Sequence, residues 1–418
     1  MSVIIINGPN KLSGQLKIQG AKNSALPILS ACVLCKGQSV IHNCPKLTDV
    51  KAAVSILENL NCKCKWENDS LIVDSSDVKC KAIPENLMRE MRSSIVFLGA
   101  ILGRCKKAMM SFPGGCELGA RPIDLHLLAL KRLGTQIDES QGFLMCEVKE
   151  KLQGNYINLS FPSVGATENI MLAASVANGR TIIENAAREP EITDLANFLN
   201  ICGAKIIGAG SSNIIIDGVK ELNGGDYSVM SDRIVTATYL AAAAITGGEI
   251  LLKNCPKEGV KNIFPIFEES GCRVIEENDN IYLSAPKKLK SLGKIRTMPY
   301  PGFPTDAQAP IMAMACLAEG SSVFVENIFE SRFKHAGELA RLGAKINIEG
   351  KVAIVQGVDK LWGANLQSRE LRGGASLVVA ALASYGKSSI IGTEFIDRGY
   401  ENLEENLRGL GAKIYREE

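Results

Sequence analysis

The 418-residue chain lacks an excess of charge of either sign. Its 47 lysine and arginine residues against 45 aspartate and glutamate residues give a net charge of +2. No long run of like charge occurs along the chain, and a surface that binds nucleic acid or anionic lipid normally leaves such an excess in the sequence. We therefore expect no nucleic-acid partner and no membrane partner, so any anionic ligand must be bound by local charge.

Long apolar runs and a signal-like beginning are also missing. The longest stretch of small apolar residues, 234–245, is interrupted by threonines and falls short of the ~20 residues that cross a bilayer. The first eight residues carry no basic region ahead of an apolar one, as a secretory signal would. We expect a cytoplasmic protein.

Cysteine is abundant, but metal-ligand spacing is absent. Cys32 and Cys35 lie one helical turn apart without a second pair at zinc spacing, and His42, His126 and His335 show no ligand spacing. Thirteen cysteines in a long chain argue against a disulfide framework and favour a reducing compartment. Twelve of them lie mostly in apolar or strand-like stretches, and we expect them in the core. These are Cys32, Cys35, Cys44, Cys62, Cys64, Cys80, Cys105, Cys146, Cys202, Cys255, Cys272 and Cys316.

The thirteenth cysteine, Cys116, has a different context. It lies among three glycines in the segment 113–124, five residues before Arg121, in a pattern that is neither helical nor alternating. Glycine allows backbone conformations closed to other residues, and a nearby arginine or helix end can lower a thiol pKa. The sequence predicts a mobile loop with a reactive thiol, and inert packing of the cysteine is the alternative.

Six similar units follow one another at intervals of about 70 residues. In each unit an amphipathic helix ends at a glycine, or once at an asparagine, and an alternating, strand-like segment follows. A glycine or asparagine at this place is the left-handed residue that ends a helix. The six positions are Asn61, Gly134, Gly203, Gly271, Gly343 and Gly411.

Each unit also contains a second helix that is apolar on nearly all faces, which is typical of a buried helix. Six such helices, three per domain, would form two bundled cores with sheets outside them. The sequence therefore predicts a two-domain α/β protein. The expected helices are 25–34, 95–102, 170–176, 235–245, 310–317 and 375–382.

Charged and polar residues stand at the starts of these buried helices. Backbone N–H groups and the helix dipole make a helix start favourable for anions. Ordinary capping by Ser, Thr or Asp explains a single polar start, but it does not explain four cations, Lys22, Arg92, Arg233 and Arg372. The pattern predicts a cleft for an anionic substrate.

Six motifs in order resemble the bacterial UDP-N-acetylglucosamine 1-carboxyvinyltransferase family of enolpyruvyl transferases, and the resemblance runs nearly end to end. The motifs are 20–27, 113–126, 163–167, 188–192, 302–306 and 397–401. The resemblance implies transfer of the enolpyruvyl group of phosphoenolpyruvate to UDP-N-acetylglucosamine without a cofactor. It also implies an α+β fold of two inverse α/β barrel-like domains, each of three repeated units. The domains would be residues 20–227 and residues 1–19 plus 228–418.

The resemblance also implies roles for single residues. Cys116 would deliver a proton to phosphoenolpyruvate and would be the target of fosfomycin, while Asp306 would act as the base. Lys22 and Arg398 would join them in the catalytic set. The phosphoenolpyruvate ligands would be Lys22, Asn23, Arg121, Arg332, Arg372 and Arg398. The nucleotide-sugar ligands would be Arg92, Arg121, Pro122, Ile123, Asp124, Leu125, Ser163, Val164, Gly165, Asp306 and Ile328.

Plainer interpretations of these residues stay open. Asp306 could cap the helix that follows it, and Arg332 and Arg372 could form structural ion pairs with Glu330 or Glu370. Glu370 also departs from the aspartate that many family members have there. At the level of function, 5-enolpyruvylshikimate-3-phosphate synthase shares the six-unit fold but lacks the Cys116 loop as it stands here. A nucleotide-sugar-binding regulator without turnover is the third reading.

Overall fold

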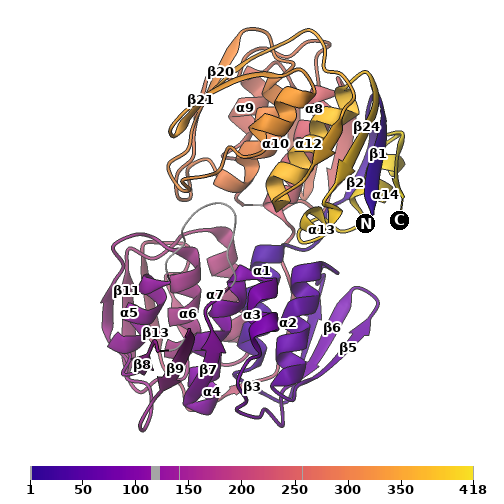
Figure 1. The fold of residues 1–418 in the computed structure, drawn as a ribbon. Helices are drawn as coiled ribbons and strands as arrows, with labels where there is room; N and C mark the ends of the chain where they lie inside the picture. Colours follow the sequence, from indigo (N-terminus) through magenta and orange to yellow (C-terminus); the bar gives the residue numbers. More distant parts are fainter. Residues whose placement is uncertain (1, 114–122, 141, 257, 418) are drawn as a thin grey trace. The chain divides into compact units, whose positions relative to one another are not determined.

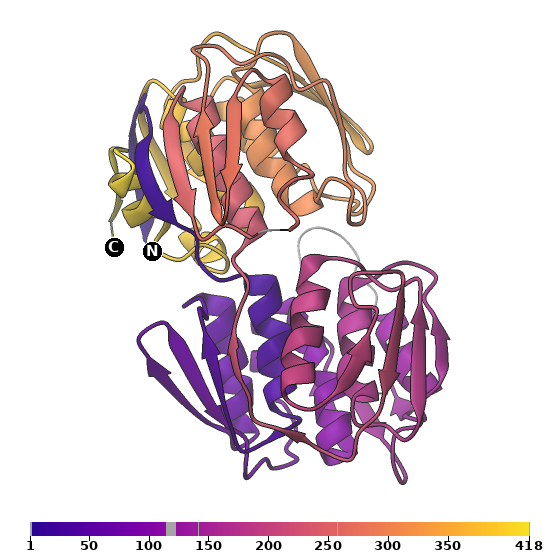
Figure 2. The same ribbon diagram turned by 180° about the vertical axis from the view of Figure 1, so that it is seen from behind.

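The protein divides into two compact units. The computed structural model describes residues 2–113, 123–140, 142–256 and 258–417. Within these ranges, residues 20–113 and 123–230 form one unit, here called the N-terminal unit. Residues 2–19 and 231–417 form the other, the C-terminal unit. The first strand of the chain therefore belongs with the second half of the sequence, as its indigo colour among orange and yellow elements shows (Figures 1 and 2).

Three buried helices that pack on one another form the centre of the C-terminal unit. They are α8 (Arg233–Ile245), α10 (Thr305–Ala315) and α12 (Leu371–Ala383). Every residue of α8 is buried, and so is every residue of α12 after the first. This burial confirms the prediction of helices that are apolar on all faces. Among the helices of the described ranges, none has the length and apolar character that spanning a membrane requires.

Three four-stranded sheets surround these helices (Figure 1). In each, an edge strand runs parallel to its neighbour and the other pairings are antiparallel. The first sheet has the order β23 (Asn365–Gln367), β24 (Gly386–Ile391), β1 (Val3–Gly8) and β25 (Ile414–Glu417). The second has β17 (Arg273–Glu277), β18 (Asn280–Ser284), β16 (Glu249–Lys253) and β2 (Ser13–Lys17). The third has β19 (Lys294–Arg296), β20 (Ser321–Val325), β22 (Val352–Gln356) and β21 (Lys345–Glu349).

The N-terminal unit repeats this plan. Its central helices are α1 (Lys22–Cys32), α4 (Phe97–Cys105), which the 3-10 turn η1 (Arg92–Val96) precedes, and α6 (Val164–Ala174). One sheet has β15 (Asp226–Ser228), β4 (Gln38–His42), β6 (Ser70–Asp74) and β5 (Lys63–Glu67). Another has β10 (Tyr156–Asn158), β11 (Arg180–Glu184), β13 (Asn213–Asp217) and β12 (Lys205–Ile207). The short strands β3 (Cys35–Lys36) and β14 (Leu222–Asn223) pair separately.

The third sheet of this unit has three strands, β7 (Lys107–Ser111), β9 (Phe143–Glu147) and β8 (Gln136–Asp138). A parallel bridge from Ile83 to Met110 stands where the other sheets have an edge strand. Apart from the β3–β14 pair, the six sheets of the described residues thus follow one pattern, which confirms the sixfold repetition and the mixed α/β class.

The outer helices end as the sequence predicts. They are α2 (Thr48–Asn59), α5 (Asp124–Arg132), α7 (Pro190–Ile201), α9 (Phe264–Glu269), α11 (Ala336–Arg341) and α14 (Leu403–Gly409). Two short helices, α3 (Glu85–Glu90) and α13 (Thr393–Ile396), complete the set in the described ranges. The left-handed residue after each outer helix has φ of 71° at Asn61 and of 95°, 104°, 94°, 96° and 92° at the five glycines. Six equivalent backbone conformations therefore confirm the repeat.

All the buried helices except α4 begin earlier than expected, because their polar starts lie inside the first turn. Helix α10 begins at Thr305 rather than Pro310, and α1 begins at Lys22 rather than Ala25. Pro310 and Pro27 thus lie within helices, although proline more often marks a helix start. The prolines have no N–H to donate to the residue four positions earlier, and this residue is Asp306 in α10 and Asn23 in α1.

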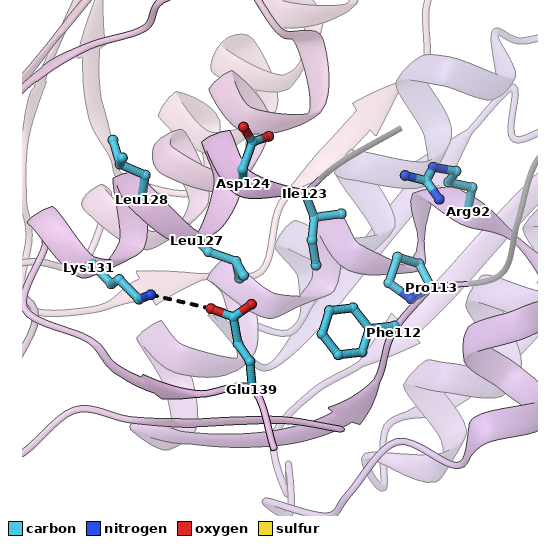
Figure 3. Close-up of a pocket in the computed structure, with 9 residues that line it drawn as sticks. All are labelled: Arg92, Phe112, Pro113, Ile123, Asp124, Leu127, Leu128, Lys131 and Glu139. Carbon is cyan, nitrogen blue, oxygen red and sulfur yellow. Dashed lines mark hydrogen bonds and ion pairs between the residues drawn. The ribbon is translucent and has the colours of Figure 1, made fainter. Parts of the chain in front are cut away.

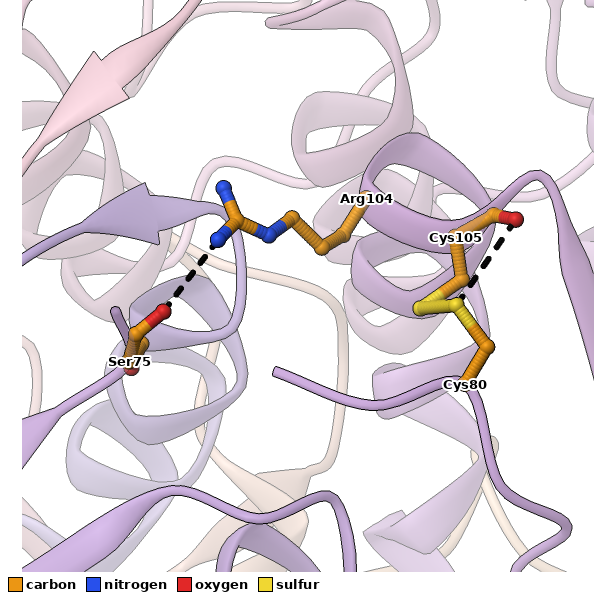
Figure 4. The surroundings of a disulfide bond; sticks show 4 residues. All are labelled: Ser75, Cys80, Arg104 and Cys105. Atoms are coloured by element: carbon orange, nitrogen blue, oxygen red, sulfur yellow. Dashed lines mark hydrogen bonds between the residues drawn. A yellow bond between two sulfur atoms is a disulfide. The ribbon is translucent and has the colours of Figure 1, made fainter. Parts of the chain in front are cut away.

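Nine of the twelve cysteines predicted to lie in the core are buried, and Cys80, Cys105 and Cys64 are not. Cys80 is exposed, Cys105 is half-buried, and the two form a disulfide (Figure 4). Their Cα atoms are 5.5 Å apart, within the usual range for a disulfide. Cys64 is half-buried, and the other nine are buried. Burial raises the pKa of the Cys316 thiol to about 12, as expected for an inert core thiol.

The disulfide gives a prediction about stability. Under oxidising conditions, Cys80→Ser should lower the free energy of unfolding by roughly 2–4 kcal/mol, because the cross-link restricts the unfolded chain. Urea unfolding with and without reductant measures the effect. Reductant should lower the free energy of unfolding of the wild type to that of Cys80→Ser. The control is Cys64→Ser, at a cysteine without a disulfide, whose free energy of unfolding should respond to reductant like that of the wild type. A wild type that is insensitive to reductant would contradict the pairing.

Candidate active site

A carboxylate between two buried guanidinium groups lies at the centre of the C-terminal unit. Arg332 Nη2 donates to Asp306 Oδ1 at 3.0 Å, and Arg372 Nε donates to Asp306 Oδ2 at 3.4 Å. The arginine side chains are 1% and 2% exposed, while that of Asp306 is 29% exposed. Asp306 is therefore the most exposed member of this cluster.

Two helix starts hold this cluster. Asp306 is the second residue of α10 and Arg372 is the second residue of α12. The N-cap of α10 is Pro304, so Asp306 does not occupy the capping position that the plainer interpretation gave it. Its carboxylate instead joins two elements far apart in the sequence.

Glu370 is the N-cap of α12. Its carboxylate accepts hydrogen bonds from the backbone N–H of Arg372, at 2.9 Å, and of Gly373. It also lies 3.9 Å from Nη1 of Arg332. Glutamate in place of aspartate thus keeps a capping role, and the ion pair at hydrogen-bonding distance from Arg332 is made by Asp306.

Arg332 and Arg372 have hydrogen-bond donors that the described residues do not fully use. Nε of Arg332 and both terminal nitrogens of Arg372 have no hydrogen-bond partner of normal geometry in the described ranges. The guanidinium carbon of Arg372 lies 5.3 Å from the centroid of the Tyr400 ring. Burial lowers the pKa of Arg372, but Tyr400, Asp306 and Asp232 outweigh it and raise the pKa overall. A charged, buried guanidinium with unused donors favours an anionic ligand.

Glu326 connects the cluster with the turn that carries Ile328. Its carboxylate accepts from Ile328 N at 2.8 Å, from Phe329 N at 3.0 Å and from Thr305 Oγ1 at 3.0 Å. The start of α10 and the turn after β20 are thereby held together. Sequence analysis missed Glu326, because no motif links it with Thr305.

Arg398 lies in a turn beside the start of α12. The turn follows α13, and Arg398 is half-buried. A Cβ added to Gly399 would lie 2.8 Å from Cδ2 of Leu371, so glycine allows this close approach. The turn therefore packs on the first residue of α12, next to Arg372.

Lys22 and Asn23 form the start of α1 in the N-terminal unit. Nζ of Lys22 lies 3.1 Å from Oδ2 of Asp49, with side-chain exposures of 13% and 3%. The hydroxyl of Ser24 donates to Asp194, which also accepts from Tyr227 Oη at 2.5 Å. These buried carboxylates fix the start of α1, and no spacing in the sequence predicts them.

A cavity of about 510 Å³ lies beside Arg92 in the same unit. Figure 3 shows Arg92 on one side and the Lys131–Glu139 ion pair on the other, with apolar side chains between them. The residues that line it are Arg92, Phe112, Pro113, Ile123, Asp124, Leu127, Leu128, Lys131 and Glu139. Three predicted nucleotide-sugar ligands, Arg92, Ile123 and Asp124, thus share one cavity.

His126, which shows no ligand spacing in the sequence, is a buried residue of α5 and lies next to the start of α6. Its Nδ1 is 2.8 Å from Nδ2 of Asn169, and a Cβ added to Gly165 would lie 3.0 Å from its Cε1. Burial, and then the charge of Arg92, lower the pKa of His126 to about 4. This neutral histidine therefore lies near the cavity residue Arg92 and packs against Gly165 at the start of α6.

The described part of the chain thus holds the predicted ligands in two groups, one per unit. Leu125 follows Asp124 in α5 and is half-buried, and Ser163 accepts from Ala166 N as the N-cap of α6, next to Val164. Cys116, Arg121 and Pro122 lie outside the described residues.

Solved structures with the same architecture define the class. The enolpyruvyl transferase NikO from Streptomyces tendae is similar with a TM-score of 0.89 and 24% identity, over 100% of this chain and 99% of that chain. EPSP synthase from Acinetobacter baumannii has a TM-score of 0.78 and 19% identity over 99% of both chains. The fold is that of the enolpyruvyl transferases.

Sequence relatives make the assignment more specific. A family model described as EPSP synthase (3-phosphoshikimate 1-carboxyvinyltransferase) matches residues 6–407. UDP-N-acetylglucosamine 1-carboxyvinyltransferase 2 of Caldanaerobacter subterraneus subsp. tengcongensis is 51% identical over 98% of both chains. The enzyme of the same name from Carboxydothermus hydrogenoformans is 45% identical over 100% of this chain and 99% of its own. The chain belongs to the UDP-N-acetylglucosamine 1-carboxyvinyltransferase branch of the EPSP synthase family.

The buried histidine gives a prediction about pH. The pKa of His126 is about 4 in the folded state against an ordinary value of 6.5, so the unfolded chain binds more protons between these values. Stability should therefore fall as the pH falls from about 6.5 towards 4. His335, whose pKa burial lowers to about 3, acts in the same direction.

Urea unfolding between pH 7.5 and 5 measures this dependence. His126→Gln should make the free energy of unfolding less dependent on pH, because the buried group no longer titrates. His335→Gln, at the second buried histidine with a lowered pKa, should reduce the dependence in the same direction. Equal slopes for His126→Gln and the wild type would show that His126 does not titrate as described.

Proposed function

We propose that this protein transfers the enolpyruvyl group of phosphoenolpyruvate to the 3-hydroxyl of UDP-N-acetylglucosamine and releases phosphate. This is the first committed step of peptidoglycan synthesis, and the proposal places it in the cytoplasm. The observation that carries it is Asp306 between Arg332 and Arg372. This cluster combines a partly exposed carboxylate with buried donors for an anion. The family relationship supplies the identity of the substrates.

The reaction needs a base and an acid at opposite ends of one addition. In the proposal, Asp306 accepts the proton of the 3-hydroxyl. At the same time, the oxygen of that hydroxyl bonds to C2 of phosphoenolpyruvate. A proton from Cys116 reaches C3, so that the double bond becomes a single bond. Elimination then breaks the bond between C2 and the phosphate oxygen, and loss of a proton from C3 restores the double bond.

Cations bind the charged groups of phosphoenolpyruvate. Arg332 and Arg372 face its carboxylate, because their unused donors match two oxygens. Lys22, Arg121 and Arg398 bind its phosphate, an assignment that the motifs support. Asn23 is a further ligand of phosphoenolpyruvate. Phosphate leaves as an anion, and cations close to it lower the barrier to elimination.

The nucleotide sugar takes the remaining ligands. Arg92, Ile123 and Asp124 line the cavity of about 510 Å³. The resemblance gives the start of α6, Asp306 and Ile328 as further ligands of the nucleotide sugar. Arg121, Pro122 and Leu125 complete the set. We propose further that the two units are the two domains of the transferase, with the sequence boundaries 20–227 and 1–19 plus 228–418.

A second candidate function is transfer to shikimate 3-phosphate. The description of the matching family model names that reaction, and both reactions share phosphoenolpyruvate. The 45–51% identity with the two UDP-N-acetylglucosamine enzymes favours the first candidate.

Phosphate release from phosphoenolpyruvate distinguishes the candidates. We expect release with UDP-N-acetylglucosamine and none with shikimate 3-phosphate. Asp306→Asn should reduce kcat by about 100-fold or more, because general-base catalysis contributes on this order. Cys116→Ser should also lose most of the activity. Stopped assays of inorganic phosphate measure the rate of the wild type with each acceptor and the rates of the two variants with UDP-N-acetylglucosamine.

Three outcomes would change the assignment. Release with shikimate 3-phosphate would select the second candidate. Binding of UDP-N-acetylglucosamine without release would favour a regulator that has lost turnover. Full activity of Asp306→Asn would remove the base from the mechanism, while Glu221→Gln, in an exposed ion pair with Lys36, should keep full activity as the control.

A further inference from the structure

The turn that carries Arg398 is held by contacts from distant elements of the C-terminal unit. Nε2 of Gln19 donates to Gly399 O at 3.3 Å, and Oε1 of Gln19 accepts from Glu401 N at 2.8 Å. Tyr400 Oη lies 2.8 Å from Oγ1 of Thr238 in α8. These contacts fix the residues after Arg398, and the residue before it is held separately.

Arg416 holds that preceding residue, Asp397. Nη1 and Nη2 of Arg416 donate to the two carboxylate oxygens of Asp397 at 2.8 and 2.7 Å. Its Nε also lies 2.5 Å from Oε1 of Glu404 in α14. A bidentate arginine–carboxylate pair fixes distance and direction together.

The arginine is itself fixed, because it belongs to β25. Arg416 pairs with Ile4 of β1 in the register of the sheet. Its side chain is 26% exposed, compared with 34% for Asp397 and 12% for Glu404. The ion pair between Arg416 and Asp397 therefore joins the turn that carries Arg398 to the sheet of β1 and β25.

This turn also adjoins the buried arginine cluster. Gly399 packs on Leu371 at the start of α12, and the Tyr400 ring lies against the Arg372 guanidinium. A displacement of the turn would thus change the place of Arg398 relative to Arg372.

We propose that Arg416 is a positioning residue for Arg398. By holding Asp397 against β25, it sets the place from which Arg398 binds the phosphate of phosphoenolpyruvate. The inference rests on the proposed function, which gives Arg398 that ligand. It adds a residue near the end of the chain that does not itself contact substrate in the proposal.

A purely structural role for Arg416 predicts a different change in the kinetic constants. Loss of a structural ion pair lowers stability and the amount of active protein, which reduces kcat but leaves both KM values unchanged. A displaced Arg398 raises the KM for phosphoenolpyruvate and leaves the KM for UDP-N-acetylglucosamine unchanged. The split between the two KM values therefore separates the roles.

The experiment compares Arg416→Gln with Arg180→Gln. Arg180 makes an equivalent bidentate pair with Asp217, at 2.7 and 2.9 Å, in the N-terminal unit. We expect Arg416→Gln to raise the KM for phosphoenolpyruvate about tenfold, since small displacements of a ligand residue have effects of this order or larger. Arg416→Lys, which keeps the charge but loses the bidentate geometry, should be intermediate. Arg180→Gln should behave as wild type.

A double-mutant cycle then tests whether Arg416 acts through Arg398. In the Arg398→Gln background, Arg416→Gln should cause no further rise in the KM for phosphoenolpyruvate, because the residue that it positions is gone. If Arg416→Gln does not fold, Asp397→Asn is used in its place, because it removes the charge of the other partner of the ion pair.

The outcomes separate the two proposals. An active wild type with an unchanged KM for phosphoenolpyruvate in the pair variants would overturn the positioning role alone. Additive effects of Arg398→Gln and Arg416→Gln would also overturn it. A wild type that releases no phosphate with either acceptor would overturn the proposed function and the inference together.

Discussion

The burial of two guanidinium groups around the carboxylate of Asp306 constrains the centre of the C-terminal unit. Removing charges from water is costly unless partners replace the water. Arg332 and Arg372 share Asp306, with Glu370 3.9 Å from Arg332. Three of their nitrogens lack a hydrogen bond of normal geometry within the described ranges, and the Tyr400 ring lies beside the Arg372 guanidinium. Such an arrangement is a poor way to stabilise a core but a suitable way to bind an anion.

The repeated architecture explains how the charges come to lie there. Each buried helix is apolar along its length, so its first turn is where polar side chains can concentrate. Thr305 and Asp306 start α10 as Lys22 and Asn23 start α1. In both helices a proline five residues after the first leaves the carbonyl of the second residue without its helical hydrogen bond. The same local design thus appears at a candidate ligand residue in each unit.

Much of the fold could be predicted because it depends on local signals. The left-handed residues, such as Asn61 and Gly343, mark helix ends through their own backbone preference. The apolar helices follow from composition alone. The sequence predicts that α1 begins at Ala25 and α10 at Pro310, but they begin at Lys22 and Thr305, because the polar residues ahead of the apolar stretch belong to the first helical turn.

The site was predictable only in part. The family resemblance implied Asp306, Arg332 and Arg372 as site residues. It did not show that the three form one cluster, since that depends on packing between α10, α12 and the turn after β20. The pairs Lys22–Asp49 and Cys80–Cys105 join segments with no shared pattern. Cys116, on which the proton-transfer step rests, lies outside the described residues.

The central claim is that the buried arginines serve a ligand rather than stability, and thermal unfolding of Arg372→Met tests it most directly. Methionine fills a similar volume without charge, and Asp306, which is 29% exposed, keeps its ion pair with Arg332. The substitution therefore leaves no buried charge without a partner, which is the costly case. The account predicts a Tm at or above that of the wild type, together with loss of phosphate release. A clearly lower Tm with phosphate release at the wild-type rate would show that Arg372 is a structural residue, and would contradict the account.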